Sequence, residues 1–458
     1  MGPPATPGTT GYRVIDRRSV LRAGLVGTAA FAAPMLLASC GRPGSAGSSG
    51  PLQFWNFYGP QSNSDPTIQA QSRWFEKTVQ DWNDTHDRKI ELVFVPGAAY
   101  LNGAKLPTAF AAGDGPDIFL ISPGDFLRYA NGDVLVDLSP HLTQAARDDF
   151  FPDALATRII DGDVYGLPME IEPLAMWYSP KSWEKAGLAQ GDIPTTWDEM
   201  LTVGQKLQSP SRAGLVFEVT PGYYQNFTWY PWLWQGGGEV TVDGRSGLDS
   251  PAGRAALDLF GRAISSGVAP RTLPAAGDLI SAFTADQAGM WESGIWNVAS
   301  FRTTAPDTSI DVFKLPTPPG GKYVTALGGW AFVANAQGRE PDVAAEFVVW
   351  ALGSEDPASV ERMVQWCTVA KSDIAPRRSA LTEGEHRGGY DSPLLRKFKD
   401  DIFPGGRSEP RVPPVVYKSV SDAIQQVQLA GKAPAADAKT ASEAINAYMT
   451  TYHGGALV

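Results

Sequence analysis

The chain has 458 residues, of which 43% are hydrophobic and 19% are charged, and its formal net charge at pH 7 is −11. This length exceeds what one hydrophobic core normally serves, so two or more domains or lobes are expected, and the composition is that of a globular protein rather than a disordered one. The acidic balance disfavours nucleic acid and anionic lipid as partners, because phosphate binding needs clustered lysine and arginine.

The first 39 residues have the pattern of an export signal. Arg17 and Arg18 form a twin-arginine pair, and residues 23–39 are an apolar run that is too short and too rich in Ala and Gly for a transmembrane helix. The run ends in Leu-Ala-Ser-Cys, which resembles a bacterial lipobox, where the Cys thiol receives a diacylglyceryl group. We expect a twin-arginine lipoprotein signal peptide over residues 1–39, and a lipidated Cys40 that opens a flexible tether over residues 40–51. The mature protein would then be extracytoplasmic, held at the cell membrane by its lipid alone.

Residues 52–121 alternate short apolar runs with helical periodicity. Strands are expected over residues 52–58, 90–95 and 117–121, with helices over residues 67–83 and 104–112. This β-α-β-α-β order predicts a parallel sheet covered by helices. Ligands bind at the carboxyl ends of the strands in such sheets, so residues 55–61 and 122–125 are candidate ligand contacts.

The second half of the chain continues the mixture of strands and helices. Residues 169–178 are expected to be extended, with acids at Glu170 and Glu172, and residues 322–334 contain a Gly-Gly-Trp element. Helical periodicity or capping residues predict helices over residues 195–208, 250–266, 341–352, 415–429 and 441–448.

An aromatic segment, YYQNFTWYPWLWQGGG, occupies residues 223–238. Its rings alternate with amide and hydroxyl side chains, a mixture that suits a ligand with apolar faces and polar edges, such as a sugar ring. The alternative is that these rings form part of the hydrophobic core, where aromatic side chains are common.

No catalytic or metal-binding motif is found in the sequence. The four histidines are neither paired at i, i+4 nor close to a cysteine, and the G-x-S-x-G, G-x-G-x-x-G and P-loop patterns are absent. Glu170 and Glu172 would share one face of a strand, whereas a glycosidase needs two acids that flank the bond from separate elements. We therefore expect no cofactor, no metal and no enzymatic activity. Cys367 would lack a disulfide partner if Cys40 is lipidated, and is expected to be a small buried hydrophobic residue.

A series of short stretches over residues 52–450 matches the motifs of one family in order. They are Phe54-Trp55-Asn56, Gly115-Pro116-Asp117-Ile118, Tyr165-Gly166-Leu167-Pro168, residues 174–180, Trp197-Asp198-Glu199, residues 289–296, Gly328-Gly329-Trp330 and residues 375–379. Together they resemble the extracellular solute-binding proteins (family 1), the maltose-binding-protein-like group that feeds ABC importers. Each motif is weak alone, whereas their order and spacing are specific.

The resemblance implies an α/β fold of the two-lobed periplasmic-binding-protein type, with crossing hinge strands and a ligand cleft between the lobes. The crossings would fall near residues 171–175, 324–329 and 370–375. Lobe 1 would comprise residues 52–172 and 329–372, and lobe 2 residues 173–328 and 373–455.

The resemblance also implies a set of ligand-binding residues. Lobe 1 and the hinge would supply Tyr58, Gln61, Ser122, Asp125 and Glu172; lobe 2 and the crossings would supply Tyr224, Asn226, Trp229, Trp296, Gly329, Trp330 and Arg378. The tryptophans would stack on the ligand, the two acids would accept hydrogen bonds from hydroxyl groups, Asn226 would both donate and accept, and Arg378 would donate. Trp232 and Trp234, further along the aromatic segment, are expected in the core.

Three functions follow as alternatives. The first is a monomeric binding lipoprotein that delivers a carbohydrate, a sugar or oligosaccharide, to the permease of an ABC importer. The second is a binder of glycerol 3-phosphate or a glycerophosphodiester, which would need Arg378 and further donors around the phosphate. The third, from another class, is a secreted carbohydrate-active hydrolase.

Overall fold

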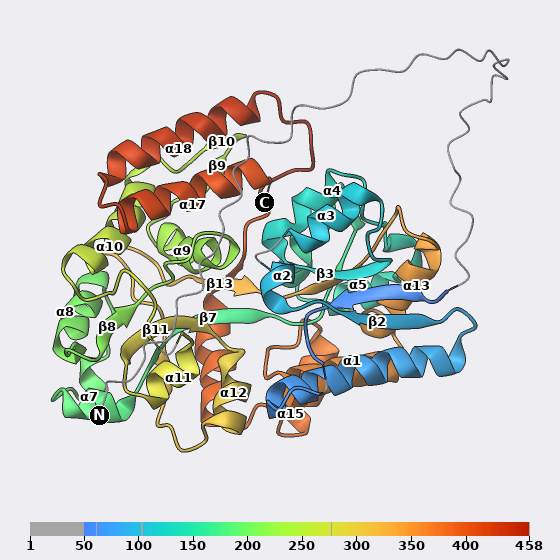
Figure 1. Cartoon of the computed structure of the whole chain (residues 1–458), viewed down its shortest axis with the longest axis horizontal. Helices are drawn as coiled ribbons and strands as arrows, with labels where there is room; N and C mark the ends of the chain where they lie inside the picture. The colour runs from blue at the N-terminus through green and yellow to red at the C-terminus, as the bar shows by residue number, and fades with distance from the viewer. Residues whose placement is uncertain (1–49, 61, 102–103, 276, 458) are drawn as a thin grey trace, which may run out of the picture. The chain divides into compact units, whose positions relative to one another are not determined.

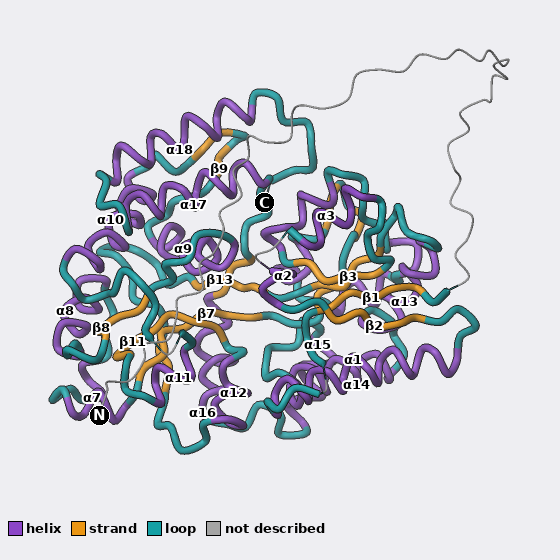
Figure 2. The backbone as a smooth tube through the Cα atoms, in the orientation of Figure 1, coloured by secondary structure: helices purple, strands orange, loops and turns teal. Residues whose placement is uncertain are grey.

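The computed structural model of the chain describes residues 50–60, 62–101, 104–275 and 277–457. The predicted signal peptide, Cys40 and Gln61 lie outside these ranges. Two large sheets with their helices make up most of the described part (Figures 1 and 2). None of the described helices combines the length and the hydropathy needed to cross a membrane.

The first sheet has the strand order β2-β1-β3-β14-β6. Its strands are β1 (Leu52–Asn56), β2 (Ile90–Phe94), β3 (Ile118–Ile121), β6 (Leu167–Pro168) and β14 (Ala331–Ala334). Strand β1 pairs in parallel with both β2 and β3, which confirms the parallel arrangement predicted for residues 52–121. The accompanying helices are α1 (Pro66–Thr85), α2 (Gly97–Leu101), α3 (Lys105–Ala112), α4 (Phe126–Ala130), α5 (Gln144–Asp149), α6 (Pro152–Ala156), α13 (Pro341–Leu352), α14 (Pro357–Gln365) and α15 (Arg378–His386). We call this sheet and these helices the first lobe.

The second sheet has the order β15-β13-β7-β11-β8, and β12 also pairs with β7. Its strands are β7 (Glu172–Tyr178), β8 (Ala213–Val216), β11 (Ala288–Gly294), β12 (Asp311–Phe313), β13 (Thr325–Gly328) and β15 (Gly406–Ser408). Its helices are α7 (Pro180–Lys185), α8 (Trp197–Leu207), α9 (Tyr223–Gln235), α10 (Pro251–Ser265), α11 (Leu279–Thr284), α12 (Asn297–Thr304), α16 (Pro393–Lys397), α17 (Pro414–Gln428) and α18 (Pro434–Met449). We call this part the second lobe. Two short hairpins complete the described strands: β4 (Ile159–Ile160) with β5 (Asp163–Val164), and β9 (Thr241–Val242) with β10 (Arg245–Ser246).

Strand β7 is the centre of the second lobe, and all seven of its residues are buried. Successive side chains on a strand point to opposite faces. Met176 accordingly packs into one hydrophobic cluster, whereas Trp177 packs into another on the opposite face. Helices therefore cover both faces of this sheet.

Local sequence signals account for several helix boundaries. Thr196 caps α8 and forms a capping box with Glu199, as the sequence predicts for this helix start. The predicted apolar stripe of α17 is buried, from Val416 to Val427. Helix α18 begins at Pro434, before the predicted residue 441, because proline is well suited to the first helical turn and the Ala-rich segment carries little periodic signal.

The chain passes between the two sheets more than once. Residues 169–171 join β6 to β7, residues 329–330 join β13 to β14, and Ile171 pairs with Ile374 in a further crossing segment. The predicted assignment of residues 373–455 to the second lobe does not hold for α15, which packs against α14 of the first lobe. Helix α16, by contrast, contacts β12 of the second sheet. After residues 371–376, the chain forms helix α15 on the first lobe, and it passes to the second lobe only after that helix.

Candidate functional site

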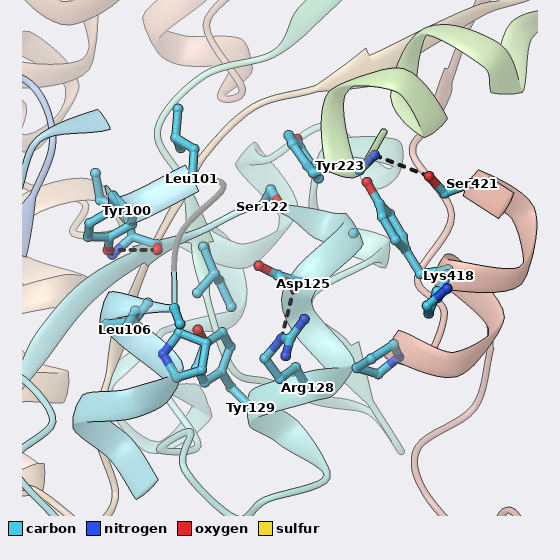
Figure 3. A pocket seen from close by; sticks show the side chains of 18 of the residues that line it. Tyr100, Leu101, Leu106, Ser122, Asp125, Arg128, Tyr129, Tyr223, Lys418 and Ser421 are labelled. Carbon is cyan, nitrogen blue, oxygen red and sulfur yellow. Dashed lines mark hydrogen bonds and ion pairs between the residues drawn. The ribbon is translucent and has the colours of Figure 1, made fainter. Parts of the chain in front are cut away.

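A cleft of ≈ 700 Å³ lies between the two lobes. Its first wall follows the carboxyl end of β3, where the sequence predicted ligand contacts, and includes Ser122 and Asp125. Its second wall comes from the start of α9 and from α17 (Figure 3). The polar and aromatic side chains in the lining are Tyr100, Ser122, Asp125, Arg128, Tyr129 and Trp330 from the first lobe and Tyr223, Tyr417, Lys418, Ser421 and Asp422 from the second.

Each charged side chain in this lining has a partner of opposite charge. The Arg128 Nε atom donates to Asp125 Oδ1 at 3.1 Å. On the opposite wall, the Lys418 Nζ atom donates to Asp422 Oδ2 at 2.6 Å, one helical turn away. The two cations and two carboxylates of the lining therefore balance one another.

Aromatic rings from both lobes meet at the cleft. Trp330 packs edge-on against Phe57, with ring centroids 4.7 Å apart, and lies 6.2 Å from the ring of Tyr223. Tyr223 is in turn nearly parallel to Tyr417 at 6.4 Å. Trp330 and Tyr223 belong to different lobes, so the rings form an apolar surface that spans the cleft.

Gly329 places Trp330 at this position. Its φ is +125°, a backbone conformation that residues with a Cβ atom rarely adopt. A Cβ added at this position would lie 2.2 Å from the carbonyl oxygen of Glu170. The close approach of these two crossing segments therefore requires glycine. Gly329 contributes through the backbone rather than as a ligand contact of its own.

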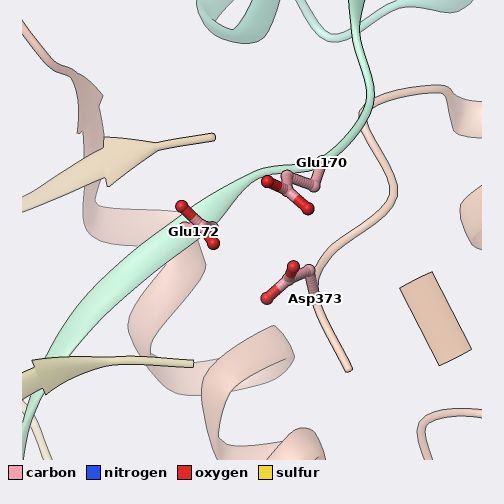
Figure 4. A group of neighbouring side chains, drawn as sticks. All are labelled: Glu170, Glu172 and Asp373. Atoms are coloured by element: carbon pink, nitrogen blue, oxygen red, sulfur yellow. The ribbon is translucent and has the colours of Figure 1, made fainter. Parts of the chain in front are cut away.

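A buried charge cluster lies at the crossings, where Glu170, Glu172 and Asp373 point toward one another (Figure 4). The Lys371 ammonium lies among them, 2.9 Å from Glu170 Oε1 and 3.3 Å from Asp373 Oδ2, and makes its closest contact with Glu172. Tyr58 completes the cluster, because its hydroxyl accepts from Lys371 Nζ at 2.9 Å and donates to Glu170 Oε1 at 3.3 Å.

The protonation of this cluster follows from its burial. Desolvation raises the pKa of Glu172 to about 7, although Lys371 acts to lower it, and also raises the pKa of Asp373. Burial alone would lower the pKa of Lys371, but the surrounding carboxylates of Asp373, Glu170 and Glu172 raise it well above its ordinary value. The three carboxylates are close enough to hold a metal ion. The ammonium group already fills the cation's place, so the cluster does not fit a metal.

Two of the predicted ligand residues, Tyr58 and Glu172, belong to this cluster rather than to the lining of the cleft. Two other predicted ligand residues, Tyr224 and Trp296, form a separate aromatic group on the second lobe. The Tyr224 hydroxyl lies 3.1 Å from Ser293 Oγ, and its ring meets Trp296 edge-on at 6.0 Å. Both rings are partly exposed. Ser122, Asp125 and Trp330 are the predicted side chains that line the ≈ 700 Å³ cleft.

Three predicted ligand residues are placed elsewhere by the structure. Asn226 and Trp229 are fully buried within α9, and Asn226 Nδ2 donates to the Tyr417 carbonyl at 2.9 Å. Arg378 lies on the surface of the first lobe, where its Nη1 donates to the carbonyls of Asp148 and Phe150 at 2.6 and 2.9 Å. Other elements surround helix α9, so most of its aromatic side chains are buried in the core. Trp232 and Trp234 are among them, as predicted.

Sequence reasoning missed several residues of the cleft, among them Tyr223, Tyr417 and Lys418. Tyr223 is the first residue of α9 and therefore lies at the exposed end of the aromatic segment. The pairs Asp125–Arg128 and Lys418–Asp422, spaced at i, i+3 and i, i+4, were visible in the sequence. Such spacing is common on helix surfaces and does not by itself indicate a ligand site.

Two α/β lobes joined by crossing segments, with a cleft between them and a buried hinge, define a two-lobed substrate-binding protein. Residues 65–356 match the family of bacterial extracellular solute-binding proteins. The chain belongs to this family, which confirms the resemblance inferred from its motifs.

Similar proteins support the same conclusion. The arabinooligosaccharide-binding protein of Bacillus subtilis (strain 168) is 27% identical over 414 residues, covering 81% of this chain and 86% of that protein. The galactooligosaccharide-binding protein of the same organism is 23% identical, covering 61% of this chain and 66% of that protein.

Solved structures match the fold. An ABC transporter solute-binding protein from Thermotoga lettingae bound with α-D-tagatose has a TM-score of 0.73 at 22% identity, covering 88% of this chain and all of that one. UgpB from Mycobacterium tuberculosis in complex with glycerophosphocholine has a TM-score of 0.72 at 18% identity, covering 88% and 99% of the two chains. The predicted two-lobed periplasmic-binding-protein fold is confirmed.

Proposed function

We propose that this protein captures a neutral carbohydrate, a sugar or oligosaccharide, in the cleft between its lobes and delivers it as a monomer to the permease of an ABC importer. The observation that carries the proposal is the wall of rings contributed by Trp330, Tyr223 and Tyr417, beside hydroxyl and carboxylate groups. Such rings stack on the C–H faces of a sugar while the polar groups bind its hydroxyls. The names of the two oligosaccharide-binding relatives support the same ligand class.

The charge arrangement favours a neutral ligand over a phosphate. Arg128 and Lys418, the cations of the described cleft lining, are each paired with a carboxylate of that lining. Arg378, which a phosphate ligand was expected to use, is engaged by backbone carbonyls of the first lobe. Glycerol 3-phosphate or a glycerophosphodiester remains the second candidate, supported by the likeness in fold to a glycerophosphocholine-bound protein.

A ligand panel tests this function. The purified protein is melted with arabinotriose, maltotriose, galactotriose, glycerol 3-phosphate and glycerophosphocholine, and hits are titrated by calorimetry. We expect a neutral sugar to stabilise the protein, by about 2.7 kcal/mol at a concentration of 100 Kd. Binding by the phosphates in place of the sugars would overturn the neutral-ligand assignment. Release of shorter sugars on prolonged incubation, checked by chromatography, would indicate a hydrolase instead.

We propose further that residues 1–39 are removed as a twin-arginine signal and that the body is anchored through a lipid on Cys40. The basis is the order of twin arginine, apolar run and lipobox. Replacing Cys40 by Ala in the full chain should release the exported protein from the membrane fraction into the soluble fraction. Replacing Cys367, which is buried, by Ala serves as the matched control and should leave the protein with the membrane. Retention of the Cys40 variant on the membrane would contradict the anchor.

A further inference from the structure

Another buried acid, Glu409, lies at the seam between the lobes and has no role in the function proposed so far. It follows β15, and its backbone N–H donates to the Leu327 carbonyl at 3.1 Å, which ties it to the second sheet. Its side chain is fully buried. The Tyr223 hydroxyl donates to Glu409 Oε2 at 3.3 Å, whereas Glu409 Oε1 has no hydrogen-bond partner among the residues that the structure describes.

Glu409 packs directly on the first lobe at Gly124. An added Cβ on Gly124 would lie 2.5 Å from Glu409 Oε1 and 3.1 Å from the Tyr223 ring. The missing side chain therefore allows the second lobe to approach this closely. Gly124 and Tyr223 both line the cleft, so Glu409 lies immediately behind the point where the two walls meet.

The surroundings of Glu409 favour its neutral form. Burial raises its pKa to about 8. The Tyr223 hydrogen bond, the Arg158 charge and the nearby Gly124 backbone N–H have smaller lowering effects, while Asp125 acts to raise it. Arg158 is itself buried, and its terminal nitrogens donate to Ala154, Thr157 and Gly329, so it acts on Glu409 at a distance. The remaining titratable groups that face Glu409 are Tyr230 of α9 and Tyr417 of α17.

We propose that Glu409 is a positioning residue for ligand capture: its protonated carboxyl lets the two lobes close, and loss of that proton to water favours their separation. Separation would hydrate the carboxyl and return it toward the ordinary behaviour of a glutamate. The proposal rests on capture by closure of the lobes, as in the proposed function, but not on the identity of the ligand.

The sign of the pH dependence follows from linkage. The closed arrangement binds a proton more tightly than the separated one, so closure is fully favoured at low pH. It weakens as pH rises from the ordinary pKa of a glutamate, about 4.3, to the raised value of about 8. The closed population relative to the open one should fall by up to about tenfold per pH unit in this window. Glu172, whose pKa is raised to about 7, also titrates in this window, so a Glu409 variant is needed to separate the two.

Energy transfer between dyes on the two lobes measures closure without any ligand. Exposed Thr108 of α3 and Gln426 of α17 are replaced by Cys, since both helices contribute to the cleft lining. Cys367 is buried and burial raises its thiol pKa, so it should not compete for the dyes. We expect transfer to fall between about pH 5 and pH 8 in this labelled parent. Glu409→Gln keeps the shape of the side chain but cannot ionise. As pH rises, this variant should retain more of its low-pH energy transfer than the parent does. Superimposable curves would overturn the proposal.

Two further variants complete the test. Glu443→Gln removes an exposed carboxylate on α18 and should follow the parent curve. Gly124→Ala places a methyl group where Glu409 docks, and should give low transfer at every pH with a flattened profile. If Glu409→Gln does not fold, a parent-like profile in Gly124→Ala overturns the proposal by itself. Failure of every sugar in the panel would refute the proposed function alone, because the transfer measurement uses no ligand.

Discussion

Replacing Lys371 by Met is expected to lower the free energy of unfolding at pH 7.5 by about 3–5 kcal/mol, the cost of removing one partner from a buried ion pair. The ammonium is the single cation within ion-pair distance of Glu170, Glu172 and Asp373 in the described part of the chain, and Tyr58 also depends on it for a hydrogen bond. Without it, the carboxyl groups must either remain charged and buried or take up protons.

The loss should therefore be smaller at pH 5, where those carboxyl groups protonate more readily. Urea unfolding at pH 7.5 and pH 5 measures both values. Lys77→Met is the matched control, because Lys77 is 74% exposed and pairs with Asp81 on the surface of α1. We expect it to change the free energy of unfolding by less than about 1 kcal/mol. A Lys371→Met protein as stable as the parent at pH 7.5 would show that the cluster does not hold the crossings together.

Replacing Trp229 by Ala is expected to cost about 3–5 kcal/mol of stability, as for other large buried aromatic residues. The Trp229 side chain is completely buried in the core of the second lobe, so its removal leaves a cavity. Trp330→Ala should behave differently, because Trp330 is only half-buried and lines the cleft. It should weaken binding of the sugar identified in the panel by about tenfold or more, at a smaller cost in stability.

Thermal unfolding and calorimetric titration of both variants separate the two roles. The structure makes Trp229 a core residue, in place of the ligand contact that the sequence predicted. A Trp229→Ala protein with parent-like unfolding and weakened sugar binding would restore the earlier interpretation. Equal losses of stability in both variants would instead place Trp330 in the core.

Several of the longer helices and four strands were predictable from the sequence because they depend on neighbouring residues. The capping box of Thr196 and Glu199 and the buried stripe of α17 are local patterns with local consequences. The alternation of strands and helices over residues 52–121 likewise predicted the parallel pairing of β1 with β2 and β3. The motifs, read in order, also identified the family and with it the fold.

The candidate site was predicted only in part. The segment after β3 was recognised because ligands favour the carboxyl ends of parallel strands, and Ser122 and Asp125 do line the cleft. The aromatic segment was misread at Trp229, since composition does not reveal which faces of α9 other elements cover. Arg378 was misplaced because α15 packs on the first lobe, a choice made by contacts remote in sequence.

The sequence by itself determined strands β1, β2, β3 and β7, several of the longer helices, the export pattern and the family. It also determined that Glu170 and Glu172 share one face of an extended segment. Only the tertiary structure decided that Lys371 and Asp373 join them and that Glu409 docks on Gly124. The physical reason is that burial and charge pairing depend on segments far apart in the chain, which no local pattern of residues records.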